Sequence, residues 1–179
     1  MAELTQIIQQ RDQCFASLRF YTCLQKFSSL GWLCHSVLTD DNLIATAVPI
    51  ASGYQFPYMG VAVESKYILS RFAYCHTVGG QLVLESPLSQ AQVQILHWKG
   101  AALINELARP HTCGELEAQI AGIASETIQQ FVSLLLSAQM LSEIPPNDND
   151  PEQASDIFAQ WDFHDLLFQV LSALAPAGG

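Results

Sequence analysis

The sequence predicts an α+β fold made of tandem winged helix-turn-helix units, the first of them incomplete, followed by a C-terminal docking helix. Three observations predict this fold. A helix-forming stretch at the start of the chain leads into two short β-rich runs. Further β-rich runs then precede three helical patterns, an order typical of a winged helix-turn-helix. An amphipathic, aromatic segment follows a proline-rich stretch near the end of the chain.

Residues 1–50 are interpreted as the C-terminal half of a first winged-helix unit. Helix formers dominate residues 2–30, and apolar residues recur every three positions from Phe15 to Phe27. We interpret this spacing as one apolar stripe on a single helix face. Gly31 follows the pattern, as a glycine just past a helix end does.

Two β-rich runs, at residues 32–38 and 43–50, complete this half-unit. The Thr-Asp-Asp-Asn sequence between them tolerates turn geometry, so the pair predicts a hairpin. Residues 51–66 come next and combine glycines, a proline and three aromatic residues. This composition predicts a linker that still packs on the rest of the protein.

Residues 67–144 are interpreted as a second winged-helix unit of a kind that recognises peptides. Residues 67–76 and 81–85 are rich in strand formers and flank a Val-Gly-Gly turn, which predicts a second hairpin. Residues 90–97 alternate apolar and polar side chains and predict a further strand. A strand exposed at the edge of such a sheet could accept a peptide as an added strand.

Three helices are expected after this sheet. The first covers residues 98–107, and the second begins with a Thr-x-x-Glu capping box at Thr112. Ser125 is expected to cap the third helix, which runs to about Met140. Residues 141–144 then predict a short returning strand.

The end of the chain has a different composition. Residues 145–155 are rich in proline, asparagine and aspartate and predict a linker, and residues 156–179 predict an amphipathic docking helix. A histidine between two aspartates in this helix is interpreted as an ion-paired surface residue rather than a catalytic one, because no nucleophile accompanies it. The side chains expected to dock a partner are Trp161, Phe163, His164 and Phe168.

Charge is distributed unevenly along the chain. The formal net charge is −10, and every Lys and Arg lies at or before Arg109. The third helix of the second unit contains no cation, so DNA binding by this unit is not expected. Arg11, Arg19 and Lys26 are the candidates for a DNA-binding regulator that uses the first half of the chain. No secretory signal or membrane segment is found, which predicts a cytoplasmic protein.

The cysteines and histidines do not indicate a metal site. The chain has five cysteines and no CxxC pair, so we expect reduced thiols and no bound metal. It also lacks nucleotide-binding, metalloprotease and nucleophile-elbow motifs. We therefore predict no catalytic residue on this chain.

Several segments carry a family resemblance. Residues 67–85, 91–97 and 112–143 resemble the N-terminal region of SagB-type dehydrogenases, which include the cyanobactin oxidases. The run Trp-Asp-Phe-His-Asp-Leu-Leu-Phe at residues 161–168 is the most specific of these similarities, and residues 24–50 resemble the end of the winged-helix unit that comes first in the family.

The resemblance implies an FMN-dependent oxidation of azolines to azoles in a ribosomally made peptide. It also implies that winged-helix modules hold the precursor's leader. Residues 169–173 depart from the family, which has there a basic stretch that begins the flavin phosphate site. We therefore expect no cofactor on this chain, and FMN only in a separate or missing nitroreductase-like catalytic domain. The expected partners are a precursor leader peptide and a separate flavin-binding oxidase subunit, and a homo-oligomer is a further option.

A leader-binding part is the preferred interpretation, and three others stay open. The chain could be an inactive truncated remnant, a structural interaction protein or a DNA-binding regulator. For the leader groove we single out side chains of the third strand and the third helix of the second unit. Each of them could instead be packed in the core, and only those that are exposed could line a leader groove. The set is Val93, Ile95, Ile128, Phe131 and Leu135.

Overall fold

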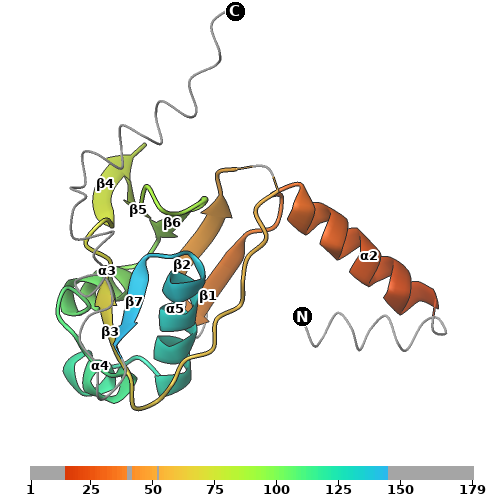
Figure 1. The fold of residues 1–179 in the computed structure, drawn as a ribbon. Helices are drawn as coiled ribbons and strands as arrows, with labels where there is room; N and C mark the ends of the chain where they lie inside the picture. The colour runs from red at the N-terminus through yellow and green to blue at the C-terminus, as the bar shows by residue number, and fades with distance from the viewer. Residues whose placement is uncertain (1–14, 40–41, 52, 145–179) are drawn as a thin grey trace, which may run out of the picture.

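The computed structural model describes residues 15–39, 42–51 and 53–144 and confirms an α+β fold (Figure 1). These residues form a five-stranded antiparallel sheet, a two-stranded sheet and four helices. The predicted linker at 145–155 and the predicted docking helix at 156–179 lie outside the described residues. Within the described part, no helix is both long enough and apolar enough to cross a membrane.

The five-stranded sheet contains both predicted hairpins and the predicted third strand. Strands β1 and β2 form the first hairpin, β4 and β5 form the second, and β6 lies between β2 and β5. Strands β1 and β4 are therefore the two edges of the sheet. The strand bounds, in spatial order, are β1 His35–Thr39, β2 Asn42–Pro49, β6 Ala91–Ile95, β5 Gln81–Glu85 and β4 Tyr74–Val78.

The two predicted units are not structurally separate. Strand β2, from the first unit, pairs with β6, from the second, with Ala45 opposite Ile95 and Ala47 opposite Val93. Side chains of both hairpins belong to one hydrophobic core. A two-stranded hairpin has too little apolar face to be stable alone, which explains why the first hairpin joins the sheet of the second unit.

The strand expected at 67–76 is divided between two sheets. Its first part is β3 (Lys66–Leu69), which pairs with β7 (Leu141–Ile144) in the two-stranded sheet, and its second part is β4. A turn separates them, in which Ala73 N–H donates to Ser70 O at 2.9 Å. Phe72, inside this turn, is completely buried, so the chain bends to place its ring in the interior.

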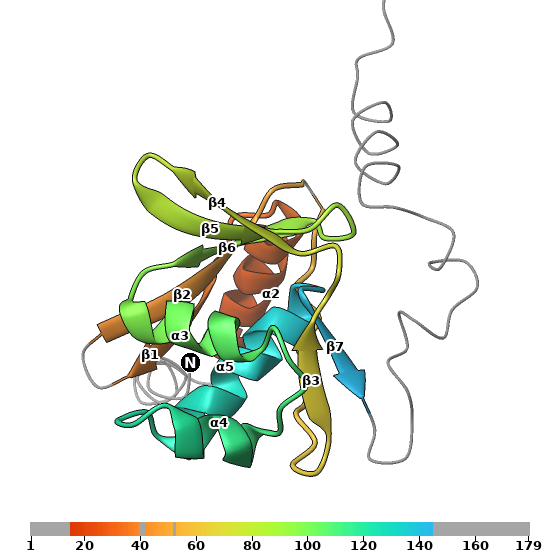
Figure 2. The same ribbon diagram turned by 90° about the vertical axis from the view of Figure 1, so that its left-hand side faces the viewer.

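Three helices pack near the sheet (Figure 2). They are α3 (Trp98–Glu106), α4 (Cys113–Gln119) and α5 (Ser125–Ser137). The capping box at Thr112 is confirmed in both of its hydrogen bonds. The expected cap at Ser125 is wrong, because Ala124 has the extended cap conformation, Ser125 is already helical, and no side chain caps this helix.

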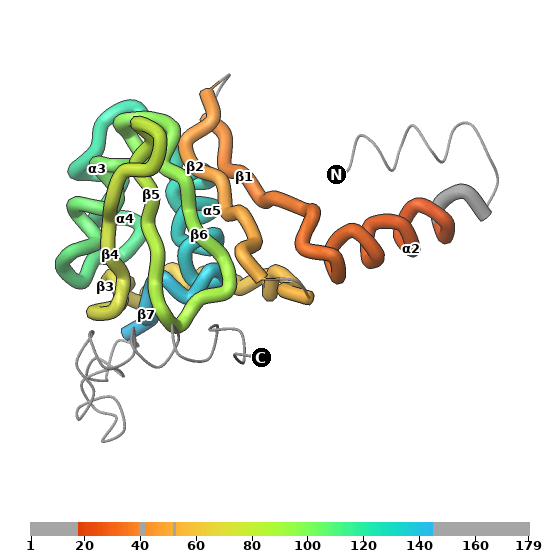
Figure 3. The backbone as a smooth tube through the Cα atoms, turned by 90° about the horizontal axis from the view of Figure 1, so that it is seen from above, coloured from red at the N-terminus to blue at the C-terminus, as the bar shows by residue number. Residues whose placement is uncertain are grey.

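Helix α2 (Phe15–Ser29) projects away from the rest of the protein, as Figure 3 shows. It ends before Gly31, whose φ of +69° confirms the predicted terminating glycine. The prediction that these apolar residues form a stripe on one helix face is wrong. At about 100° per residue, each three-residue step drifts by about 60°, so the stripe winds around the helix instead of staying on one face. Leu18 and Tyr21 are accordingly 65% and 49% exposed.

Candidate binding site at the edge of strand β1

The structure places the five predicted groove residues in the interior. Each is at most 4% exposed, and all five belong to the main hydrophobic core. Buried side chains cannot touch a peptide, so the core-packing alternative describes them and the groove prediction for them is wrong. They are Val93, Ile95, Ile128, Phe131 and Leu135. The predicted docking residues Trp161, Phe163, His164 and Phe168 lie outside the described residues.

The sheet itself identifies a more suitable surface, the outer edge of β1. Leu96 N–H donates to Ile44 O at 2.9 Å, which fixes how the hydrogen bonds alternate along β2. Ile44 bonds toward β6, so Ala45 bonds toward β1, where its partner is Val37. Ser36, next to Val37, therefore directs its backbone N–H and C=O outward. No other strand of the described residues pairs with this edge.

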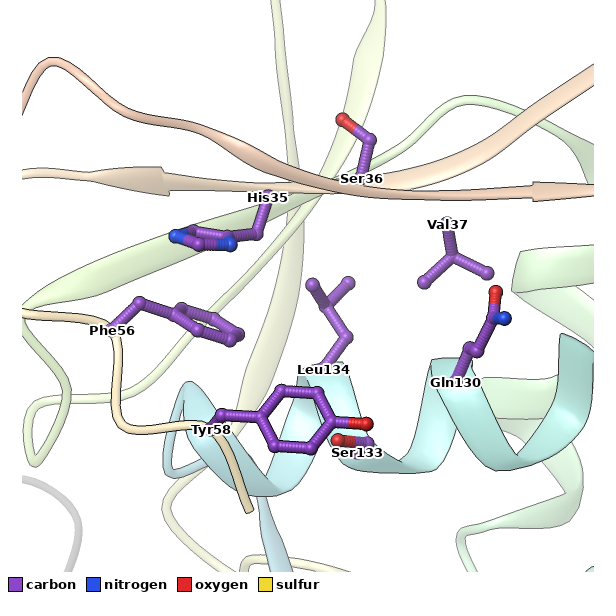
Figure 4. Close-up of a pocket in the computed structure, with 8 residues that line it drawn as sticks. All are labelled: His35, Ser36, Val37, Phe56, Tyr58, Gln130, Ser133 and Leu134. Carbon is purple, nitrogen blue, oxygen red and sulfur yellow. The ribbon is translucent and has the colours of Figure 1, made fainter. Parts of the chain in front are cut away.

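A hollow lies between β1 and helix α5 (Figure 4). It has a volume of about 260 Å³. Val37 and Leu134 form its apolar floor, and Ser133 and Gln130 add polar groups from the helix. Phe56 and Tyr58 close it from a third side. The hollow can therefore take a small apolar group that has a polar neighbour.

Phe56 and Tyr58, which close the hollow beside α5, belong to the segment predicted as a linker. Hydrogen bonds anchor this segment on α5. Tyr54 Oη donates to Ser137 O at 3.0 Å, and Met59 N–H donates to Ser137 Oγ at 3.0 Å. Ser133 Oγ donates to Met59 O at 2.5 Å. We call residues 53–62 the wall segment. Its aromatic residues were the sequence signal that this stretch packs on the protein, but they do not show where.

A second hollow lies between β1 and helix α2. Its volume is about 480 Å³, and Leu24, Leu33 and Cys34 give it an apolar lining. Gln25 and Ser28 of the helix contribute polar groups. His35 and Ser36 line both hollows, so the two hollows meet at the start of the edge strand.

The site carries no fixed charge. Neither hollow is lined by Asp, Glu, Lys or Arg. Burial lowers the pKa of His35, so its imidazole is neutral at neutral pH. Among the described residues, no group of three or more His, Cys, Asp and Glu is placed to hold a metal ion. The arrangement is suited to an uncharged extended chain and not to a phosphate or a metal.

Two family models match the chain. One, described as cyanobactin oxidase ThcOx, matches residues 67–174, which is more than half of the chain. The other, described as the ThcOx helix turn helix domain, matches residues 1–58. The gap between the matched regions, residues 59–66, begins within the wall segment and extends beyond its end. No curated protein matches the chain.

Proposed function

The chain belongs to the cyanobactin oxidase family, and from this we propose that it is a non-catalytic part of an azoline-oxidising system that binds the leader of a precursor peptide at the outer edge of β1. Family membership makes it a protein of ribosomal peptide natural-product biosynthesis related to an oxidoreductase. The observation that carries the peptide proposal is a strand edge with which no described strand pairs, and whose His35 and Ser36 line two uncharged, partly apolar hollows.

The binding mode follows from strand geometry. An extended peptide added to β1 would exchange backbone hydrogen bonds with Ser36. Alternate side chains of a strand point to opposite faces, so one set would enter the hollow beside α5 and the other the hollow beside α2. The lining of both hollows favours apolar or small neutral side chains at these positions.

We propose that oxidation takes place on a separate flavin-binding subunit or domain. A flavin phosphate is usually held by cations or by a helix N-terminus. The two hollows have no Lys or Arg, and α5 carries Glu126 in its first turn. The described residues at this site therefore do not fit FMN, and no step through a flavin is assigned to them. Their role would be to hold and orient the precursor.

The test is a fluorescence-anisotropy titration of the full chain with a labelled leader from the precursor encoded nearby, a scrambled leader and a DNA duplex at two salt concentrations. Ser36→Pro removes the outward N–H, and Thr77→Pro, on the exposed edge strand β4, is the matched control. We expect saturable micromolar binding of the leader alone, weakened about tenfold or more by Ser36→Pro, since one lost hydrogen bond and a blocked edge exceed ~1.4 kcal/mol.

Three results would contradict this proposal. Leader binding that Ser36→Pro and Thr77→Pro weaken equally would remove β1 as the site. Absence of leader binding would favour the remnant interpretation, and salt-dependent binding of the duplex alone would favour the regulator.

A further inference from the structure

Helix α2 has a second surface that peptide binding does not use. Leu24 and Ser28 face the hollow beside β1, while the opposite side of the helix is open to solvent. We call that side, made of Leu18, Arg19, Thr22, Cys23 and Lys26, the outer face of α2. All five residues are exposed. Thr22 and Lys26 also line an open hollow with Gln55 of the wall segment, so the rest of this face is the part without a neighbour among the described residues. A 15-residue helix that packs on little else is marginally stable in water, and exposed apolar groups on it indicate a missing contact.

The outer face is cationic. Arg19 and Lys26 are seven residues apart, which places them on the same side of the helix about 10.5 Å apart. No carboxylate lies between Phe15 and Ser29. Among the described helices, α2 alone combines cations with the absence of any acid. The occupant should therefore be acidic and also partly apolar.

We propose that the acidic aromatic segment of this same chain, residues 156–168, docks on the outer face of α2. This segment lies outside the described residues, and its chemistry complements that face. It contains Asp156, Asp162 and Asp165, no Lys or Arg, and several large apolar side chains that include Phe158 and Trp161. Carboxylates would pair with Arg19 and Lys26 while apolar side chains cover Leu18.

The connection is long enough for the segment to come from the same chain. Residues 145–155 can span about 35 Å when extended. A domain of ~130 residues has a radius of gyration of ~14 Å, so this reach is comparable with its diameter.

Other occupants fit the outer face less well. A second copy of α2 would bring cation against cation. Among the described residues of this face, nucleic acid would meet two cations, with the 65%-exposed Leu18 beside them, and would gain little from counterion release.

Hydrogen–deuterium exchange on the full chain tests the proposal. The variants are Arg19→Glu/Lys26→Glu, Asp162→Lys/Asp165→Lys and the combination of all four. Lys66→Glu/Arg109→Glu is the matched control, because it makes the same charge change at two exposed cations away from α2. Core amides near Leu103 and Phe131 report whether each variant is folded.

We expect the wild type and the control to exchange slowly in both α2 and residues 156–168. Each charge-reversing pair should speed exchange in both segments by about tenfold, because coupling between two sites is reciprocal. The variant that combines all four substitutions restores opposite charges on the two segments and should recover most of the protection. Exchange of residues 156–168 that does not respond to the charge on α2, with the core still protected, would overturn the proposal. This readout does not depend on peptide binding, so it can fail or succeed independently of the leader-binding proposal.

Discussion

The imidazole of His35 lies almost flat on the ring of Phe56, with the ring centroids 4.0 Å apart and the ring planes 15° apart. His35 begins the edge strand β1, and Phe56 comes from the wall segment. The pair therefore joins the two sides of the hollow beside α5. Stacking of aromatic rings adds about 0.5–1.5 kcal/mol beyond the burial of area.

Truncating Phe56 tests whether the wall segment shapes the binding site. Phe56→Ala removes both the stacking partner of His35 and one side of the hollow. We expect the dissociation constant for the leader, measured by anisotropy, to rise about five- to tenfold, or ~1–1.4 kcal/mol. Trp98→Ala removes a 62%-exposed aromatic ring that lines neither hollow and should leave the affinity unchanged. An equal loss in both variants would mean that Phe56 has no specific role.

Stability should fall at mildly acidic pH because of His35. Burial lowers the pKa of this imidazole below its unfolded value of 6.5. The unfolded state therefore binds the proton more readily, so the free energy of unfolding is unaffected above pH 6.5 and decreases as the pH falls below it. His35→Phe retains an aromatic ring against Phe56 and removes the titration. Urea unfolding between pH 7.5 and 5 should show a shallower decline for this variant, and parallel declines would contradict the assignment to His35.

Tyr67 should contribute to anchoring the wall segment. Its hydroxyl donates to Ala62 O at 2.9 Å and accepts from Ala62 N–H at 2.7 Å, and the residue is completely buried. Burial is the main reason that its pKa is raised to about 12. Tyr67→Phe leaves both backbone groups of Ala62 without this partner, so we expect the free energy of unfolding in urea to fall by about 1–3 kcal/mol. Tyr21→Phe, at a half-exposed position on α2, should change it by less than about 0.5 kcal/mol.

Two glycines in helices should respond in opposite ways to alanine. A Cβ on Gly100, in α3, would lie 3.0 Å from Ile44 Cγ2 and 3.1 Å from both Ile44 O and Ile95 Cγ2. A Cβ on Gly114, in α4, would meet nothing within 4 Å. Thermal or urea unfolding should show that Gly114→Ala stabilises the protein by up to about 1 kcal/mol, whereas Gly100→Ala destabilises it by about 1–3 kcal/mol. A stabilising Gly100→Ala would show that α3 can move away from the sheet at little cost.

Local signals account for the parts of the fold that the sequence predicts correctly. The hairpin turn at Gly79 and Gly80 and the capping box at Thr112 depend on neighbouring residues only, and both are present. The break between β3 and β4 depends on the burial of Phe72, which is a tertiary event. Apolar residues at every third position of α2 lie on nearly the same side over a few residues, but the row of side chains winds around the helix over a longer stretch.

The site was harder to predict than the fold. Apolar side chains such as Ile128 and Phe131 have the same sequence pattern whether they line a groove or fill a core, and here they fill the core. The open edge depends on which strands pair, and β1 becomes an edge because β6 pairs with β2. Phe56 and Tyr58 reach the site from a segment without regular secondary structure, for which no periodic pattern exists.

The pairing of β2 with β6 also limits how proteins of this family can be recombined. A chimera that takes residues 1–58 from one relative and the following region from another would cut through one continuous sheet. Ala45 and Ala47 lie opposite Ile95 and Val93, and both small residues are buried, so a larger residue inherited at either position would collide with the interior. Residues 1–58 therefore cannot be exchanged between relatives as an independent unit, and changes meant to test the proposed peptide specificity should begin at the exposed residues around the two hollows.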